Sequence, residues 1–212
     1  MDAGFINTAQ TFFRNLAANN EKPWWEENRT TYDNVLKPGA KKLLEDVQPR
    51  LAELMDEEVT TKLFRPYRDT RFSKDKTPYK PYMHMLWQVN VGREPVAFFF
   101  GIEPDYIRCG GGMLGMGKEV LEDWRKFCDL DAKRMMGAAE RIEAEGYEFR
   151  EPELVRIPRG YPKDHENARM LRMKSVIATK KIEPTDDIAD LLMSEFATFK
   201  PMTDVLLSVA CA

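Results

Sequence analysis

Three closely spaced runs of strand-like sequence at the centre of the chain constrain its fold more than any other feature. Residues 83–90 alternate apolar and more polar positions, the period of two that a half-buried strand shows. Residues 96–102 form a more apolar run, and residues 106–109 follow after a tight turn. Connections this short join antiparallel strands, because a parallel pair needs a crossover of a dozen or more residues. The sequence therefore predicts an antiparallel meander.

Helical periodicity dominates both ends of the chain. We expect helices at 5–16, from Pro23 to a break at Pro38-Gly39, at 43–54 with a kink or split at Pro49, and at 118–127, 131–142, 168–173, 185–199 and from Pro201 onward. Further strands are expected at 59–64, 147–149, 154–157 and 175–180. Strands that cluster centrally, with helices at both ends, predict an α+β fold. Its central, mostly antiparallel sheet should carry the N- and C-terminal helices.

Length and composition predict one domain over residues 1–212. Hydrophobic residues make up 43% of the chain and charged residues 32%, a mixture typical of soluble globular proteins. The net charge of −3 argues against a dedicated duplex DNA binder, which usually carries a basic excess. No signal-like or membrane-spanning run is visible, and Cys109, Cys128 and Cys211 form no metal or disulfide pattern. We therefore expect a cytoplasmic protein with no metal site.

A string of basic residues between positions 65 and 80 is the first candidate for function. It holds six cations and two carboxylates, a local balance of +4. Arginine presents a planar fork that fits a phosphate or carboxylate, and lysine adds compact charge. The candidate ligand-binding residues are Arg68, Asp69, Arg71, Ser73, Lys74, Lys76, Tyr79 and Lys80. The alternative is a structural ion-pair network, in which the two carboxylates neutralise the cations and fix the loop.

A second candidate is the glycine run Gly110, Gly111 and Gly112, which is expected to end the meander as a turn before a helix. Such a turn lets the backbone approach a ligand and offers N–H groups to an anion. The run matches neither common phosphate-binding glycine pattern, so a turn with no ligand is the alternative.

The two histidines, His84 and His165, are the third candidate. No spacing suggests a metal site. His165 shares an irregular loop with Arg159, and a neutral imidazole there could transfer a proton. If the protein is an enzyme, His165 and Tyr79 are the weak candidates for that role.

The chain also resembles the family catalogued as domain of unknown function 2461. The resemblance rests on Asn19-Asn20, Trp24-Trp25 and Asn28, on the string from Arg68 to Lys80, on Gly110-Gly111-Gly112, and on Pro158 to Tyr161, Asp164-His165, Leu171-Arg172 and Lys174. It covers nearly the whole chain, and its central string is long and therefore specific. It implies a single soluble domain and brings no reaction with it. Because it marks three loops together, it favours one site shared by the basic string, the glycines and the His165 loop.

Three classes of function follow from the sequence. The first is a domain that binds a small phosphate- or carboxylate-bearing ligand through the basic loop. The second is a nucleic-acid or protein interaction module that uses the same loop, with Tyr67, Phe72 and Tyr79 as stacking groups. The third is a purely structural loop. The sequence specifies no cofactor, reaction or oligomeric state.

Overall fold

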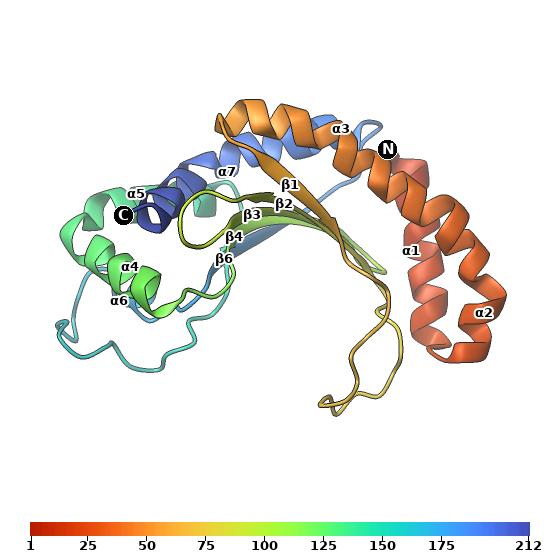
Figure 1. Ribbon diagram of the computed structural model, residues 1–212, viewed down its shortest axis with the longest axis horizontal. Helices are drawn as coiled ribbons and strands as arrows, with labels where there is room; N and C mark the ends of the chain where they lie inside the picture. Colours follow the sequence, from red (N-terminus) through yellow and green to blue (C-terminus); the bar gives the residue numbers. More distant parts are fainter.

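The computed structural model describes residues 1–212 and contains a six-stranded antiparallel sheet with helices on one face and at both ends (Figure 1). The strands are β1 (Val59–Leu63), β2 (Met83–Val89), β3 (Val96–Ile102), β4 (Ile107–Met113), β5 (Glu148–Phe149) and β6 (Val176–Ile182), in the spatial order β1-β2-β3-β4-β6-β5. The helices are α1 (Ala3–Ala18), α2 (Lys22–Thr31), the π-helical turn η1 (Tyr32–Leu36), α3 (Lys37–Met55), α4 (Lys118–Leu130), α5 (Ala132–Ala144), α6 (Ala168–Leu171) and α7 (Ile188–Ala210). The predicted α+β fold with an antiparallel sheet is confirmed. None of the helices combines the length and apolar character needed to cross a membrane.

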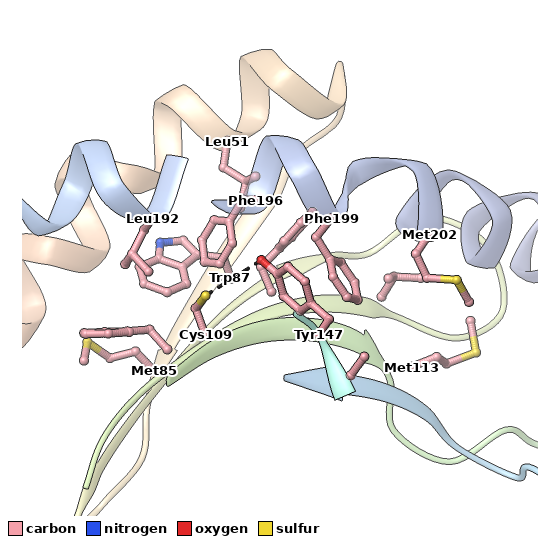
Figure 2. Close-up of a cluster of buried hydrophobic side chains, with 14 of the residues drawn as sticks. Leu51, Met85, Trp87, Cys109, Met113, Tyr147, Leu192, Phe196, Phe199 and Met202 are labelled. Atoms are coloured by element: carbon pink, nitrogen blue, oxygen red, sulfur yellow. Dashed lines mark hydrogen bonds between the residues drawn. The ribbon is translucent and has the colours of Figure 1, made fainter. Parts of the chain in front are cut away.

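One face of the sheet is buried under α3 and α7. Alternate residues of β2 and β3 point to these helices, so the period of two in the sequence becomes one apolar face. The side chains drawn in Figure 2 fill this layer: Leu51, Met85, Trp87, Cys109, Met113, Tyr147, Leu192, Phe196, Phe199 and Met202. Phe196 lies at its centre, with its ring centroid 4.9 Å from that of Phe98 and 5.5 Å from that of Trp87. The buried residues form one contiguous core from α1 to α7.

No helix lies over the opposite face of the sheet, which is concave (Figure 1). The register places two rows of side chains on this open face. One row contains Lys62, Leu86, Phe99, Gly110 and Thr179, and the next contains His84, Gly101, Arg108 and Lys181. The basic loop, residues 65–80, extends below the sheet at one end, and residues 150–167 extend below it at the other end (Figure 1). The open face therefore lies between two of the loops that the sequence marked.

The expected break at Pro38-Gly39 is wrong, because the chain stays helical from α2 through η1 into α3. In η1 the Lys37 N–H donates to Tyr32 C=O, the wide spacing of a π-helix, immediately before the proline. Gly39 allows α1 to pack closely, because a Cβ there would lie 2.2 Å from a ring atom of Phe5. The close packing of α1 against this position, rather than a break in the helix, therefore explains the glycine at 39.

The other corrections also concern prolines and local signals. Pro49 does not split α3, and Pro201 lies inside α7, which is one helix from Ile188 to Ala210. Buried residues on both sides of Pro201 contact the sheet, and this burial outweighs the roughly 3 kcal/mol that an internal proline costs. Asp187, rather than the expected Thr185, caps α7 by accepting two backbone N–H groups. Residues 154–157 form no strand.

Candidate functional site

The basic loop leaves β1 after Leu63 and returns to β2 through a closed neck. Backbone N–H groups of Arg68 and Lys80 donate across the neck, with N···O distances of 2.8 and 2.7 Å. Asn20, just before α2, holds the Tyr79 backbone twice, donating to its C=O at 2.9 Å and accepting its N–H at 3.1 Å. The Tyr79 ring is buried and stacks on Trp25 with centroids 4.5 Å apart. The neck is therefore anchored to the N-terminal helices.

The tip of the loop neutralises much of its own charge. Arg71 forms a bidentate pair with Asp69, with N···O distances of 3.0 and 2.7 Å, and Arg68 pairs with Asp75. The hydrogen bond from Arg71 holds the pKa of Asp69 below its usual value. Lys76 Nζ donates to a backbone carbonyl inside the loop at 2.9 Å. The predicted ion-pair network therefore exists at the tip, where Ser73 and Lys74 also lie.

A cavity of about 380 Å³ lies at the root of this loop, between the loop and the helical segment from α2 to α3. We call it the root cavity. Its lining residues are Trp25, Arg29, Tyr32, Asp33, Lys37, Lys41, Leu63, Phe64, Arg65, Pro66 and Tyr67. Four cations therefore face one carboxylate.

The charges of the root cavity are unevenly paired. Arg29 is held by Asp33 at 3.3 Å and by a second carboxylate, that of Glu26, at 3.4 Å. Lys37, Lys41 and Arg65 form no ion pair with any carboxylate of the protein. These three cations are available to an anion in the cavity.

Aromatic rings and a buried donor form the inner wall of the root cavity. Trp25 is 2% exposed, and its indole Nε1 has no hydrogen-bond partner in the protein. Burial raises the pKa of the neighbouring Tyr32 to about 12, so its hydroxyl stays protonated at neutral pH. Tyr32 lies in η1, and single π-helical turns are frequent at functional sites.

Two more cations gather around Phe64, which lines the same cavity. Lys62 Nζ lies 5.0 Å and Lys80 Nζ 5.7 Å from the centroid of its ring. Burial, and then the positive charges of Arg65, Arg68 and Lys62, lower the pKa of Lys80. Neither lysine pairs with a carboxylate, so the positive potential of the root cavity continues onto the edge of the open face.

A histidine–glutamate–arginine cluster occupies the open face beside Phe64. His84 Nε2 lies 2.8 Å from Glu103 Oε1, and Arg108 donates to the same oxygen from Nε at 3.1 Å. Burial would raise the pKa of Glu103, but the hydrogen bond and charge of His84 and the charge of Arg108 outweigh it and lower that pKa. The Tyr82 ring stacks on His84 with centroids 4.1 Å apart. His84 Nδ1 has no hydrogen-bond partner in the protein.

The glycine run is not a turn. Gly110, Gly111 and Gly112 lie inside β4, whose strand continues to Met113, so their backbone groups belong to the sheet ladder. A Cβ at Gly110 would lie 2.1 Å from the Ala178 carbonyl oxygen. The run therefore permits close approach of β6, and the predicted anion-binding turn before α4 is wrong.

The loop of residues 150–167, which contains His165, lies at the end of the molecule away from the basic loop (Figure 1). His165 Nδ1 accepts the Asn167 N–H at 2.9 Å, so the ring proton is on Nε2, which donates to Asp129 at 3.0 Å. Both nitrogens are thus engaged within the protein. Arg159 lines a separate cavity. The structure does not bring the basic loop, the glycines and the His165 loop to one cavity.

Several residues of the root cavity escaped the sequence reasoning. Lys37 and Lys41 are one helical turn apart, a spacing that places both on one face of α3, but the expected break at Pro38 hid this signal. Trp25, which the sequence marked only through the family resemblance, is buried and also lines the cavity. No three His, Cys, Asp or Glu side chains come together as a potential metal site.

Comparison with known proteins gives one match. The family described as "Conserved hypothetical protein (DUF2461)" matches residues 8–204, which include the root cavity, the basic loop and the open face. No curated protein and no solved structure matches the chain.

Proposed function

Because the chain belongs to the DUF2461 family, whose description names no ligand, we propose from the geometry alone that it binds a small phosphate- or carboxylate-bearing ligand in the root cavity. The observation that carries this proposal is the set of cations in the cavity, Lys37, Lys41 and Arg65, which no carboxylate of the protein neutralises. Like charges repel one another, and a bound anion removes that repulsion.

The cavity also indicates the rest of the ligand. Its volume of about 380 Å³ is at the lower end of small-molecule sites, which suits a metabolite rather than a polymer segment. Trp25, Tyr32, Phe64 and Tyr67 provide aromatic walls for a flat or apolar portion. We therefore expect a compact anion with an apolar part.

The proposal concerns binding, and it assigns no proton transfer to Tyr79 or His165. The Tyr79 ring is buried against Trp25, and both ring nitrogens of His165 are engaged. If a reaction takes place at this end of the open face, His84 is the better acid–base group. Its Nε2 is oriented by Glu103 and its Nδ1 has no partner.

The test is calorimetric titration with inorganic pyrophosphate, preceded by a thermal-shift screen of phosphorylated metabolites, nucleotides and dicarboxylates. Lys41→Ala should weaken binding roughly tenfold, because a charge-assisted hydrogen bond contributes about 1.5–3 kcal/mol. Lys42→Ala is the matched control, since Lys42 is the next residue of the same helix, pairs with Asp46 and does not line the cavity. Arg71→Ala at the loop tip is a second control. Equal weakening by all three variants, or no binding of any anion, would refute the proposal.

A second candidate, binding of single-stranded nucleic acid across the open face, rests on a different observation. Arg108 lies over Phe99 and Lys181 over Tyr106, with distances to the ring centroids of 5.3 and 4.5 Å, on the face that also carries Lys62. Cations and rings on one sheet face are typical of single-strand binders. This candidate predicts affinity that rises with oligonucleotide length and falls steeply with salt. A compact ligand in the root cavity predicts no length dependence.

A further inference from the structure

A second cavity, of about 630 Å³, lies in the loop that precedes α6, at the end of the molecule away from the basic loop (Figure 1). We call it the α6 cavity. Its lining residues are Val155, Arg156, Ile157, Pro158, Arg159, Tyr161, Lys163, Ala168 and Arg172. It shares no residue with the root cavity, and the proposed function does not use it.

The lining of the α6 cavity contains four cations and no carboxylate. Arg156, Arg159, Lys163 and Arg172 form no ion pair anywhere in the protein. The tip of the basic loop shows the opposite arrangement, in which Arg71 and Asp69 neutralise one another. Positive charge therefore accumulates in the α6 cavity without a counterion from the chain.

The walls of the α6 cavity are held in place by backbone contacts. Arg172 Nε donates to Ala168 C=O at 3.1 Å, which leaves the terminal nitrogens of its guanidinium free. The backbone C=O of Arg172 accepts the Leu154 N–H at 3.1 Å and so links the two sides of the cavity. Behind them, the buried Asn167 donates to the Cys128 carbonyl at 2.9 Å. These contacts fix the backbone of the cavity and the position of Arg172.

Apolar groups stand beside the cations. Val155 is 90% exposed, although it is a large hydrophobic residue in a cavity wall. Ile157, Pro158 and Tyr161 complete an apolar side of the same cavity. A ligand that contacted only the cations would leave this surface in water, whereas one with an apolar part would cover it.

We propose that the α6 cavity is a second anion site, independent of the root cavity, that binds a phosphate ester carrying an apolar or aromatic group. Arg159, Lys163 and Arg172 contact the phosphate, and Val155 and Tyr161 contact the apolar group. Asp129, whose carboxylate accepts the His165 Nε2–H, does not line the cavity.

The experiment is calorimetric titration of the full chain with phenyl phosphate and with inorganic phosphate as probes. Wild type should bind phenyl phosphate more tightly than inorganic phosphate. The double variant Arg159→Ala/Lys163→Ala should weaken binding at this site roughly a hundredfold or more, since it removes two charge-assisted contacts. Val155→Ser should remove the preference for phenyl phosphate at the α6 cavity and leave inorganic phosphate binding unchanged.

Two controls separate this site from the rest of the molecule. Lys133→Ala removes an exposed, unpaired cation of α5 and should leave binding unchanged. Lys41→Ala should affect only the root cavity, so either site can fail while the other holds. The proposal would be overturned by no binding in wild type, by equal weakening by Lys133→Ala, or by weakening by Lys41→Ala alone. A single-stranded oligonucleotide whose binding needs both cavities would instead assign the α6 cavity to a longer polyanion track, and would also overturn it.

Discussion

Three deeply buried tryptophans differ in one respect that a mutation series can measure. Trp87 Nε1 donates to Leu44 C=O at 3.1 Å, and Trp124 Nε1 donates to Met170 C=O at 3.0 Å. Trp25 Nε1 has no acceptor, although Trp25 is just as buried. Substitution of each tryptophan by phenylalanine therefore removes the same atoms from three similar environments but only two hydrogen bonds.

The expected difference follows from the net contribution of a buried hydrogen bond. Trp87→Phe and Trp124→Phe each remove one such bond, which contributes about 0.5–1.5 kcal/mol beyond the loss of packing. The Met170 carbonyl keeps a second donor, the Met173 N–H at 3.1 Å, so it is not left unsatisfied. Trp25→Phe removes a donor that was already unsatisfied, so only the packing loss remains. We therefore expect Trp25→Phe to destabilise the protein less than either of the other two variants, by about 0.5–1.5 kcal/mol. For a chain of this length, each kcal/mol corresponds to about 2–4 °C in Tm.

The assay is urea unfolding of the three variants and wild type, followed by circular dichroism, with Tm as a second measure. The three variants should keep the m-value of wild type, which shows that only stability has changed. If Trp25→Phe is as costly as Trp87→Phe, the Trp25 indole has an acceptor in the free protein. The inner wall of the root cavity would then hold no unsatisfied donor, and that part of the reasoning would be refuted.

Three further predictions concern the sheet, the open face and the basic loop. Gly112→Ala should strongly lower Tm, because φ at this residue is +139° and the new Cβ would lie 1.8 Å from the Val176 carbonyl oxygen. Gly137→Ala is the control: a Cβ there would lie in open space on α5, so this variant should stabilise the protein by about 0.5–1 kcal/mol. The folded-state pKa of Glu103 lies below the ordinary value of 4.5, so the stability that this carboxylate contributes is present above that pH and is lost as the pH falls. The variant Glu103→Gln should therefore lose less stability than wild type on acidification, as measured by urea midpoints. Asn20→Ala should speed trypsin cleavage within the basic loop, because it releases the neck, while the midpoint of global unfolding changes less.

The sequence predicted the sheet better than the helices, for a physical reason. In a buried strand such as β3 (Val96–Ile102), consecutive residues of the sequence are apolar, so the apolar run at 96–102 matched the bounds of the strand. A proline in the sequence indicates only a local free-energy cost to a helix. At Pro38, Pro49 and Pro201 that cost is outweighed by long-range packing or absorbed by the π-helical turn, which a local pattern does not contain.

The glycine run shows the same limit in another form. The glycines at 110–112 indicate positions that must lack a side chain, and the commonest reason for such positions in a sequence is a turn. The actual cause is the close approach of backbone carbonyl groups on neighbouring strands: Ala178 and Val176 of β6 at Gly110 and Gly112, and Ala97 of β3 at Gly111. The strand β6 lies more than sixty residues away in the chain. The root cavity is similarly assembled from residues 25–41 and 63–67, whose proximity exists only after folding.

Charge density along the chain located the loop that borders the root cavity, but it gave equal weight to the tip, where the arginines are paired. The sequence counts cations, whereas binding depends on which of them remain unpaired. At the tip, Asp69 and Asp75 pair with arginines, as a structural network requires. At the root and neck, Arg65 and Lys80 have no such partner, and burial, together with the repulsion of neighbouring cations, lowers the pKa of Lys80. The proposed anion would use the cations at the root, which the carboxylates of the loop leave unpaired.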